Sequence, residues 1–423
     1  MPPSRWRSIR SMSHQRRSST SAIPTIRHQS PERLEMGPSE PEWPKGLPPT
    51  MLVGAGVVGL AIADDHVSRS IPFCLVDKNA AVLKSASQRW SHLDLSVRDV
   101  SIGIDGLSAI VVGDGTGEPP VTMPIVIESI AEIDSAKRDL FRSLHEAFGS
   151  EVALCSNTST LRIAEIAGDE PFARQVCGLH FFMPVPQRPM VEVVVNEHTD
   201  SAVIDAAIKH ARRLGKRALR VGDGSGFIVN RMLSPYLNQA LVLLCRGVTA
   251  SQLERAAMVY GMPMSPLELI DWISTPTMYH AGRAYMRAFP GRIDPSPLIP
   301  AMVKRKRFGR HCGHGLYDYP GGRRSAELAP ETNKLIETYR VADDVFTDGD
   351  VLRLLTLPMW IEGQNVLQEK VADSLETVDL AMVGGLGFSG HTSWSAFFAE
   401  LGSQDIEASI DKWQSTYRSL SRA

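Results

Sequence analysis

The sequence predicts an α/β domain built on a parallel sheet, followed by an all-α domain. Between Thr50 and about Val221, short apolar runs alternate with amphipathic stretches, as strands and helices do in a parallel sheet. After Gly226 the strand-like runs end and helical patterns follow. Hydrophobic residues make up 43% and charged residues 22% of the 423 residues, which is ordinary for a globular protein.

The individual elements follow from these runs. Six apolar segments are predicted to be strands: Thr50–Val53, Pro72–Val76, Ile125–Glu128, Glu151–Ser156, Val176–His180 and Val191–Val195. Helical patterns occupy five further segments: Ser135–Ala147, Asp200–Leu214, Phe227–Arg246, Ser251–Tyr260 and Pro266–Ile273. The segment Ser85–Gly113 contains several glycines and reads as short and irregular.

The C-terminal part contains an internal repeat. Pro235 and Val248 lie 13 residues apart, and so do Pro358 and Val371 in a second segment with similar flanking residues. Two related helical units, packed together to bury a face that neither buries alone, would explain the pattern. Chance similarity between two helices is the alternative.

These patterns divide the chain into four parts: an N-terminal extension over 1–49 that is predicted to be disordered, a sheet domain over 50–222, a first helical unit over 223–320 and a second over 321–423. The first 31 residues contain six arginines and no acidic residue, a composition typical of disorder. The extension is either a mitochondrial targeting segment or a dangling tail.

Several functional classes are disfavoured by composition. A net charge of −2 argues against a general nucleic-acid binder. The longest apolar run, Met51–Ala63, is shorter than the roughly 20 residues of a membrane-spanning helix. Five scattered cysteines without a CxxC pair predict neither a disulfide framework nor a zinc site: Cys74, Cys155, Cys177, Cys245 and Cys312.

A glycine-rich loop follows the first predicted strand. Gly54 permits a tight turn, Gly56 lets the backbone approach a pyrophosphate, and Gly59 lets the helix pack closely on the strand. An apolar helix start, Leu60–Ala63, follows the loop, and the pyrophosphate would bind to the free N–H groups at the N-terminus of this helix. Val57 and Val58, inside the loop, are counted with the cofactor-binding residues.

Asp77 strengthens this interpretation, because it ends the second predicted strand eighteen residues after Gly59. An acid there binds the ribose hydroxyls and repels a 2′-phosphate, so the sequence predicts a Rossmann-like domain that binds NAD rather than NADP. The alternative role for Asp77 is to cap the next helix.

Polar residues at other strand ends form a candidate site. Ser156–Ser159 follows one predicted strand, where ligands bind in open α/β sheets. His180 and Glu192 also lie near strand ends and could meet. A histidine beside aromatic residues is otherwise more often structural.

These segments together resemble the L-3-hydroxyacyl-CoA dehydrogenase family over about residues 51–320. The resemblance rests on six segments, in the family's order and spacing: Val53–Gly59, Ile127–Glu132, Ser156–Ser159, Gly178–Pro186, Gly226–Arg231 and Gly315–Tyr317. Residues 350–402 resemble the second helical unit of the multifunctional fatty-acid-oxidation alpha subunit.

The resemblance implies specific catalytic roles. His180 would be the general base that takes the proton from the 3-hydroxyl of the substrate, and Glu192 would orient its imidazole. Ser159 and Asn230 would hold the substrate against the cofactor. Asn230 could otherwise be a helix N-cap.

The resemblance also implies a nicotinamide side, lined by Glu132, Lys137, Ser159 and Met183. Met183 departs from the family, which usually has an asparagine there, and Ser225 and His311 replace a usual proline and lysine. The basic run Lys304–Arg307, with Arg310, is either a contact for CoA phosphates or a solvated face.

The expected function is NAD-dependent oxidation of a 3-hydroxyacyl-CoA to the 3-oxoacyl-CoA in fatty acid β-oxidation or a related pathway. The alternatives are a dehydrogenase of a smaller hydroxy acid and a non-catalytic NAD-binding partner protein. The substrate partner would be an acyl-CoA. The resemblance allows a homodimer or an association with a thiolase or hydratase. The second helical unit could instead occupy the surface through which the family dimerises, so the oligomeric state stays open. The expected location is cytoplasmic, or the mitochondrial matrix if the N-terminus is a transit peptide.

Overall fold

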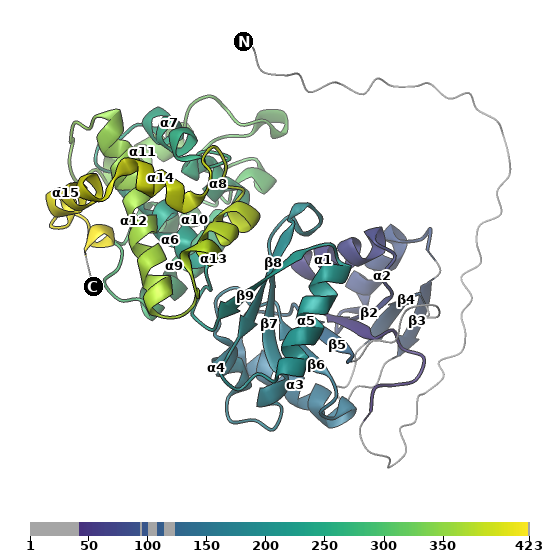
Figure 1. The fold of residues 1–423 in the computed structure, drawn as a ribbon. Helices are drawn as coiled ribbons and strands as arrows, with labels where there is room; N and C mark the ends of the chain where they lie inside the picture. The colour runs from purple at the N-terminus through teal and green to yellow at the C-terminus, as the bar shows by residue number, and fades with distance from the viewer. Residues whose placement is uncertain (1–41, 94, 100–107, 114–122, 422–423) are drawn as a thin grey trace, which may run out of the picture.

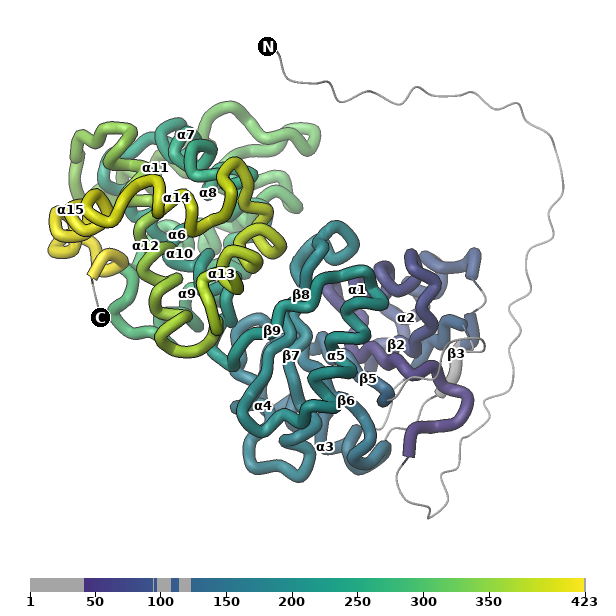
Figure 2. The backbone as a smooth tube through the Cα atoms, viewed as in Figure 1, coloured from purple at the N-terminus to yellow at the C-terminus, as the bar shows by residue number. Residues whose placement is uncertain are grey.

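The chain forms a sheet lobe and a helical lobe that meet along one side (Figures 1 and 2). The computed structural model describes residues 42–93, 95–99, 108–113 and 123–421. Most of the predicted N-terminal extension therefore lies outside the described residues. Of its last residues, Trp43 packs on Phe148 with ring centroids 4.8 Å apart, and Leu47 is buried.

The sheet lobe contains nine strands in the order β3-β4-β2-β1-β5-β6-β7-β8-β9. Their bounds are β1 Thr50–Val53, β2 Phe73–Asp77, β3 Leu95–Asp99, β4 Ser108–Val112, β5 Ile125–Glu128, β6 Ala153–Ser156, β7 Val176–Phe181, β8 Met190–Val195 and β9 Arg217–Gly222. All six predicted strands are confirmed, with ends that shift by up to two residues.

The prediction of a parallel sheet is correct for the centre and wrong toward both edges. β4 pairs antiparallel with β2 and with β3, and β8 pairs antiparallel with β7. The segment 85–113 was expected to be irregular, but it contains the end of a helix and both β3 and β4. β9 was not predicted because its arginines break the apolar run, as an exposed edge strand allows.

Helices cover both faces of the sheet, so successive strand residues are buried on opposite sides. Leu52 packs with α1 (Val57–Ser68), α2 (Ala80–Arg89) and α5 (Ser201–Arg213), whereas Met51 and Val53 pack on the other face. That face is covered by α3 (Asp134–Phe148) and α4 (Ile163–Ala167). Burial on both faces explains the nearly continuous apolar runs of the central strands.

The helical lobe begins directly after β9. Its α-helices are α6 Val229–Leu244, α7 Ala250–Tyr260, α8 Pro266–Ile273, α9 Thr275–Ala288, α10 Leu298–Lys304, α11 Pro330–Thr338, α12 Asp348–Gln368, α13 Leu375–Ala381, α14 Trp394–Leu401 and α15 Ser403–Trp413. The three helices predicted here are confirmed as α6, α7 and α8. Among the described residues, no helix is long and apolar enough to cross a membrane.

The two repeated segments form similar structures. Each consists of a long helix with an internal proline followed by a shorter helix, α6 with α7 and α12 with α13. The long helices end alike, because the Val248 N–H donates to Leu243 and the Val371 N–H donates to Val366, five residues back in both cases. α12 packs against both α6 and α7, as expected for units that bury a shared face.

Candidate active site

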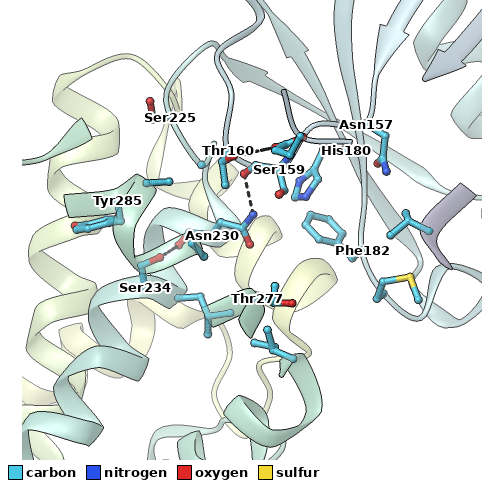
Figure 3. A pocket seen from close by; sticks show the side chains of 18 of the residues that line it. Asn157, Ser159, Thr160, His180, Phe182, Ser225, Asn230, Ser234, Thr277 and Tyr285 are labelled. Carbon is cyan, nitrogen blue, oxygen red and sulfur yellow. Dashed lines mark hydrogen bonds between the residues drawn. The ribbon is translucent and has the colours of Figure 1, made fainter. Parts of the chain in front are cut away.

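A cavity of about 400 Å³ lies between the two lobes, beyond the carboxyl ends of the central strands. In Figure 3, His180, Asn157 and Phe182 approach it from the sheet lobe, and Asn230, Ser234, Thr277 and Tyr285 approach it from the helical lobe. Crevices at this end of an α/β sheet are the usual ligand site. The cavity therefore brings together residues that the sequence placed in different motifs.

The glycine loop has the geometry that a pyrophosphate requires. Gly54 has φ +101°, and a Cβ there would lie 2.7 Å from the Ser129 carbonyl oxygen. A Cβ on Gly59 would lie 1.9 Å from the Gly54 carbonyl oxygen, so both glycines are required by the close packing. A Cβ on Gly56 would meet nothing within 4 Å, which leaves its outer side open to a ligand.

The start of α1 fits an anion. Gly56 is its N-cap, no side-chain cap bond is present, and the first turn carries no acidic residue. Val57 is 79% exposed, whereas Val58 lines the cavity. Ser129 also lines the cavity, and its buried hydroxyl has no hydrogen-bond partner among the described residues. The free N–H groups and the unpartnered hydroxyl fit the phosphates and adjoining atoms of a dinucleotide.

Asp77 is held at the mouth of this loop. Its Oδ2 accepts a hydrogen bond from the Ala55 N–H at 2.6 Å, and its Oδ1 accepts one from the Asn79 N–H at 2.7 Å. The N-cap of α2 is Asn79, so the alternative role of Asp77 as the helix cap is wrong. The carboxylate is fixed beside the glycine loop, where a ribose of the dinucleotide would lie.

Lys137, Glu128 and Glu132 form a cluster of charged side chains. Lys137 is 1% exposed, and its Nζ donates to Glu128 Oε1 at 2.5 Å and lies 3.4 Å from Glu132 Oε2. Glu128 also accepts bonds from the Ser156 hydroxyl and the Ile130 N–H, both at 2.7 Å. Burial raises the pKa of Glu128, against the opposing effect of Lys137.

Glu132 connects this cluster to the loop that follows β6. Its Oε1 accepts bonds from the hydroxyls of Thr158 and Thr160 and from the N–H groups of Ser159 and Thr160. Burial alone would raise the pKa of Glu132, but the charge of Lys137 and these hydrogen bonds hold it below its ordinary value. An ionised Glu132 therefore fixes the backbone of Ser159 at the cavity wall.

His180 and Glu192 form a buried pair at the end of the sheet. They face each other across the antiparallel strands β7 and β8, and His180 Nδ1 lies 2.7 Å from Glu192 Oε2. Glu192 is fully buried and His180 is 6% exposed. His180 Nε2 has no hydrogen-bond partner among the described residues, and the ring lines the cavity between Phe182 and Phe227. The pair presents one free imidazole nitrogen to a ligand.

The first turn of α6 completes the surroundings of Glu192. The N–H groups of Ile228 and Val229 both donate to Glu192 Oε1 at 3.1 Å. These groups would otherwise be the unsatisfied donors of a helix start, and the positive end of the helix dipole favours a carboxylate. Three hydrogen bonds thus hold Glu192 in place, with one of them directed at His180.

Asn230 and Ser159 meet across the two lobes. Ile228 is the N-cap of α6, so the alternative role of Asn230 as N-cap is wrong. The Asn230 Nδ2 instead donates to the Ser159 carbonyl oxygen at 3.1 Å, as Figure 3 shows. Met183 also lines the cavity, with 44% of its side chain exposed. Of the four predicted catalytic residues, Ser159, His180 and Asn230 line the cavity, whereas Glu192 is buried and reaches it only through its bond to His180.

The sequence reasoning missed Glu128, Tyr285 and Arg231 as cavity or near-cavity residues. Glu128 was recognisable from the sequence, because it is the acidic end of an apolar strand within the segment Ile127–Glu132. Tyr285 lies in α9, which no motif singled out. Arg231 was part of a motif, but its ion-pair partners lie more than 130 residues away.

The residues of the basic run Lys304–Arg307 differ in exposure. Arg307 is buried, and its guanidinium pairs with Asp318 at 2.6 Å, which makes this arginine structural. Lys304 and Lys306 are exposed, and Arg310 lies over the ring of Trp272 at 4.2 Å. Within the described part of the chain, no three His, Cys, Asp or Glu side chains are grouped so as to hold a metal.

Two family models match this chain. The family model "3-hydroxyacyl-CoA dehydrogenase, NAD binding domain" matches residues 50–224, and "3-hydroxyacyl-CoA dehydrogenase, C-terminal domain" matches residues 226–319. The first match confirms NAD as the predicted cofactor.

Two curated plant proteins are similar over most of the chain. The glyoxysomal fatty acid beta-oxidation multifunctional protein MFP-a of Cucumis sativus is 29% identical, over 88% of this chain and 53% of its own length. The peroxisomal fatty acid beta-oxidation multifunctional protein MFP2 of Arabidopsis thaliana is 28% identical, with the same coverage. The chain thus spans about half the length of the curated relatives it matches.

Solved structures agree on the fold. 3-Hydroxybutyryl-CoA dehydrogenase from Escherichia coli K12 superposes with a TM-score of 0.68 and 22% identity, over 89% of this chain and 97% of that one. FadB2 of M. tuberculosis superposes with a TM-score of 0.54 and 26% identity, over 65% of this chain and 100% of that one. The two family models together span residues 50–319 almost without a gap, and this range contains the cavity and its His–Glu pair. The chain therefore belongs to the 3-hydroxyacyl-CoA dehydrogenase family.

Proposed function

We propose that this chain catalyses the NAD-dependent oxidation of an L-3-hydroxyacyl-CoA to the 3-oxoacyl-CoA. The observation that carries the proposal is the buried His180–Glu192 pair, whose free Nε2 faces a cavity bordered by the dinucleotide loop. A base with a fixed tautomer, placed beside a hydride acceptor, is the arrangement that alcohol oxidation requires.

The proton of the 3-hydroxyl passes to His180 Nε2. A secondary alcohol does not ionise unaided near neutral pH, so the base acts as the C–H bond breaks. Bound NAD supplies the acceptor for the hydride that leaves C3. Glu192 holds the Nδ1–H and stabilises the imidazolium that forms, as the acid does in a catalytic triad. The two electrons leave with the hydride, and the proton stays on His180 until solvent removes it.

The neighbouring side chains would align the substrate. The hydroxyl of Ser159 and the oxygen of Asn230 are available at the cavity wall, because the bonds of these residues to other groups use the Ser159 backbone and the Asn230 Nδ2. Holding the hydroxyl and C3 against the nicotinamide converts binding energy into alignment. Glu132 and Lys137 would border the nicotinamide, and Met183 would contact it with a side chain that offers no hydrogen-bond donor.

An apolar wall opposite His180 suits the acyl group. It is formed by residues of α6, the end of α8, and α9: Leu233, Leu237, Ile273, Met278 and Ala281. This wall favours an acyl-CoA over the smaller hydroxy acid that was considered as an alternative. The retained His–Glu pair argues against the other alternative, a non-catalytic NAD-binding partner.

The direct test is a spectrophotometric assay of NADH oxidation with acetoacetyl-CoA and longer 3-oxoacyl-CoA substrates. We expect turnover with acyl-CoA substrates and none with free 3-oxo acids of the same chain length. Turnover only with the free acids would support the smaller-substrate alternative, and NADH binding without any turnover would support the non-catalytic one.

Cofactor choice has its own test at Asp77. We expect NADH to be strongly preferred over NADPH, because the fixed carboxylate repels a 2′-phosphate. Asp77→Ser should weaken use of NADH and improve use of NADPH relative to it, measured as the ratio of kcat/KM values. Equal use of both cofactors by the unaltered protein would contradict the role given to Asp77.

The cellular setting stays a prediction. The cytoplasm remains our proposed location, with the mitochondrial matrix as the alternative, while both curated relatives carry glyoxysomal or peroxisomal names. These relatives are named multifunctional β-oxidation proteins, which supports a role next to a hydratase or thiolase activity. Sedimentation and co-purification would test the homodimer and these partners.

A further inference from the structure

We infer that Arg231 is a positioning residue through which the second helical unit holds the catalytic His–Glu pair in place. The inference rests on the proposed function and extends it to a part of the chain that lies outside the cavity. Arg231 is fully buried in the first turn of α6, next to Asn230 and two residues after Val229, whose N–H binds Glu192. Whatever fixes Arg231 therefore fixes the turn that holds Glu192.

Two carboxylates of α12 fix the guanidinium of Arg231. Its Nε donates to Glu362 Oε1 at 2.6 Å, its Nη2 lies 2.5 Å from the same oxygen, and its Nη1 donates to Glu369 Oε2 at 2.5 Å. Glu362 is almost completely buried, whereas Glu369 is 35% exposed. Hydrogen bonds from Nε and Nη1 thus fix the arginine to α12, and Nη2 adds an ion-pair contact.

A second arginine balances the charge. Arg292 Nη2 donates to Glu369 at 2.6 Å, and Arg292 Nη1 lies 3.5 Å from Glu362 Oε2. The ring of Phe289 lies against both guanidinium groups, 4.3 Å from that of Arg231 and 4.6 Å from that of Arg292. Two positive and two negative groups therefore balance one another at the edge of the cavity, which Arg231 itself lines.

The segment directly after α13, Met382–Leu386, packs closely against the same turn. A Cβ on Gly385 would lie 2.6 Å from Val229 Cγ2, and a Cβ on Gly384 would lie 2.7 Å from the sulfur of Met190. Val229 opens α6, and Met190 opens β8, the strand that carries Glu192. The second helical unit therefore contacts both elements that carry or bind Glu192, once through charge and once through close packing.

The variant that tests this arrangement is Glu362→Gln, which keeps the side-chain volume and removes one charge. We expect kcat with acetoacetyl-CoA to fall by about 10- to 100-fold, the range for a displaced catalytic group, while NADH affinity is unchanged. The imidazole of His180, assigned by NMR from the difference spectrum with His180→Gln, should also change its chemical shift.

The matched control is Arg353→Gln. Arg353 also pairs with a carboxylate in the helical lobe, that of Asp405 at 3.1 Å, but it does not line the cavity. We expect this variant to leave kcat and the His180 signals unchanged.

A folded Glu362→Gln protein with wild-type kcat and wild-type His180 signals would overturn the inference. If this variant does not fold, Glu369→Gln, at the half-exposed carboxylate, is judged by the same two readouts and the same criteria. The NMR readout separates the proposed function from the inference about Arg231. An unaltered protein without NADH turnover would refute the proposed function. A response of the His180 signals to Glu362→Gln would still support the network.

Discussion

α6 and α12 are two proline-containing helices that lie side by side, yet only α6 forms part of the cavity. α12 begins with a capping box, in which Thr347 accepts from the Asp350 N–H and Asp350 accepts from the Thr347 N–H. α6 begins without a side-chain cap of this kind, and its first N–H groups bind Glu192 of the sheet lobe instead. The start of the long helix is capped by its own residues in one copy and by Glu192 of the sheet lobe in the other.

The arginines near the two prolines differ in the same way. Arg231 lies four residues before Pro235, and Arg353 lies five residues before Pro358. One residue turns an α-helix by about 100°, so the two side chains leave their helices in different directions. Arg231 is fully buried, whereas Arg353 is partly exposed, and the buried position in α12 belongs to Leu354. This difference of one residue in position places Arg231 in a buried ion-pair network and Arg353 in a partly exposed salt bridge.

The largest expected effect on kcat is at Glu192, whose carboxylate takes the place of a side-chain cap for α6. Glu192→Gln should lower kcat by about 100-fold or more, because an amide holds the imidazole in the wrong tautomer and stabilises no imidazolium. The corresponding change in the α12 cap, Asp350→Asn, should leave kcat unchanged. Steady-state kinetics of both variants check the comparison, and a similar loss in both would refute the special role of the α6 start.

A smaller effect is expected at Met183, which borders the cavity on the sheet side. Met183→Asn adds a hydrogen-bonding amide where the family usually has one, and a neutral hydrogen bond of about 0.5–1.5 kcal/mol corresponds to a roughly two- to tenfold gain in kcat or NADH affinity. Because the residue is 44% exposed, the amide would be hydrated, and we expect no loss of stability. Lower activity together with a lower Tm would instead mean that the site has repacked around the thioether.

The smallest effect is expected at the α12 cap. Thr347→Ala should reduce the free energy of unfolding by about 1 kcal/mol, the usual contribution of such a cap, and leave kcat unchanged. Chemical denaturation and the NADH assay measure the two quantities. A drop in kcat without a change in stability would show that the start of α12 is not self-contained.

Local patterns in the sequence predicted the parts of the site that are close in the chain. The spacing of Gly54, Gly56 and Gly59 predicted the loop and its open side, because each glycine acts through the backbone around it. The antiparallel pairing that joins His180 to Glu192 spans only twelve residues, so a shared strand end was predictable.

The sequence did not predict the contacts that join distant segments. The bond between Arg231 and Glu362 spans 131 residues, and no sequence pattern near either residue predicts it. The antiparallel edge strands were missed for a similar reason, since strand direction depends on the connection and not on the apolar run. The capping of α6 by Glu192 depends on the approach of the two lobes, which no single motif encodes.

The most direct test of the account is the turnover of His180→Gln beside that of the unaltered protein. Glutamine is smaller than the imidazole, lacks its basic nitrogen and is expected to leave the glycine loop unchanged. We predict that kcat with acetoacetyl-CoA and NADH falls at least about 100-fold, the lower limit for general acid–base catalysis, while NADH affinity measured by fluorescence stays the same. Unchanged turnover in a folded His180→Gln protein would contradict the assignment of His180 as the catalytic base.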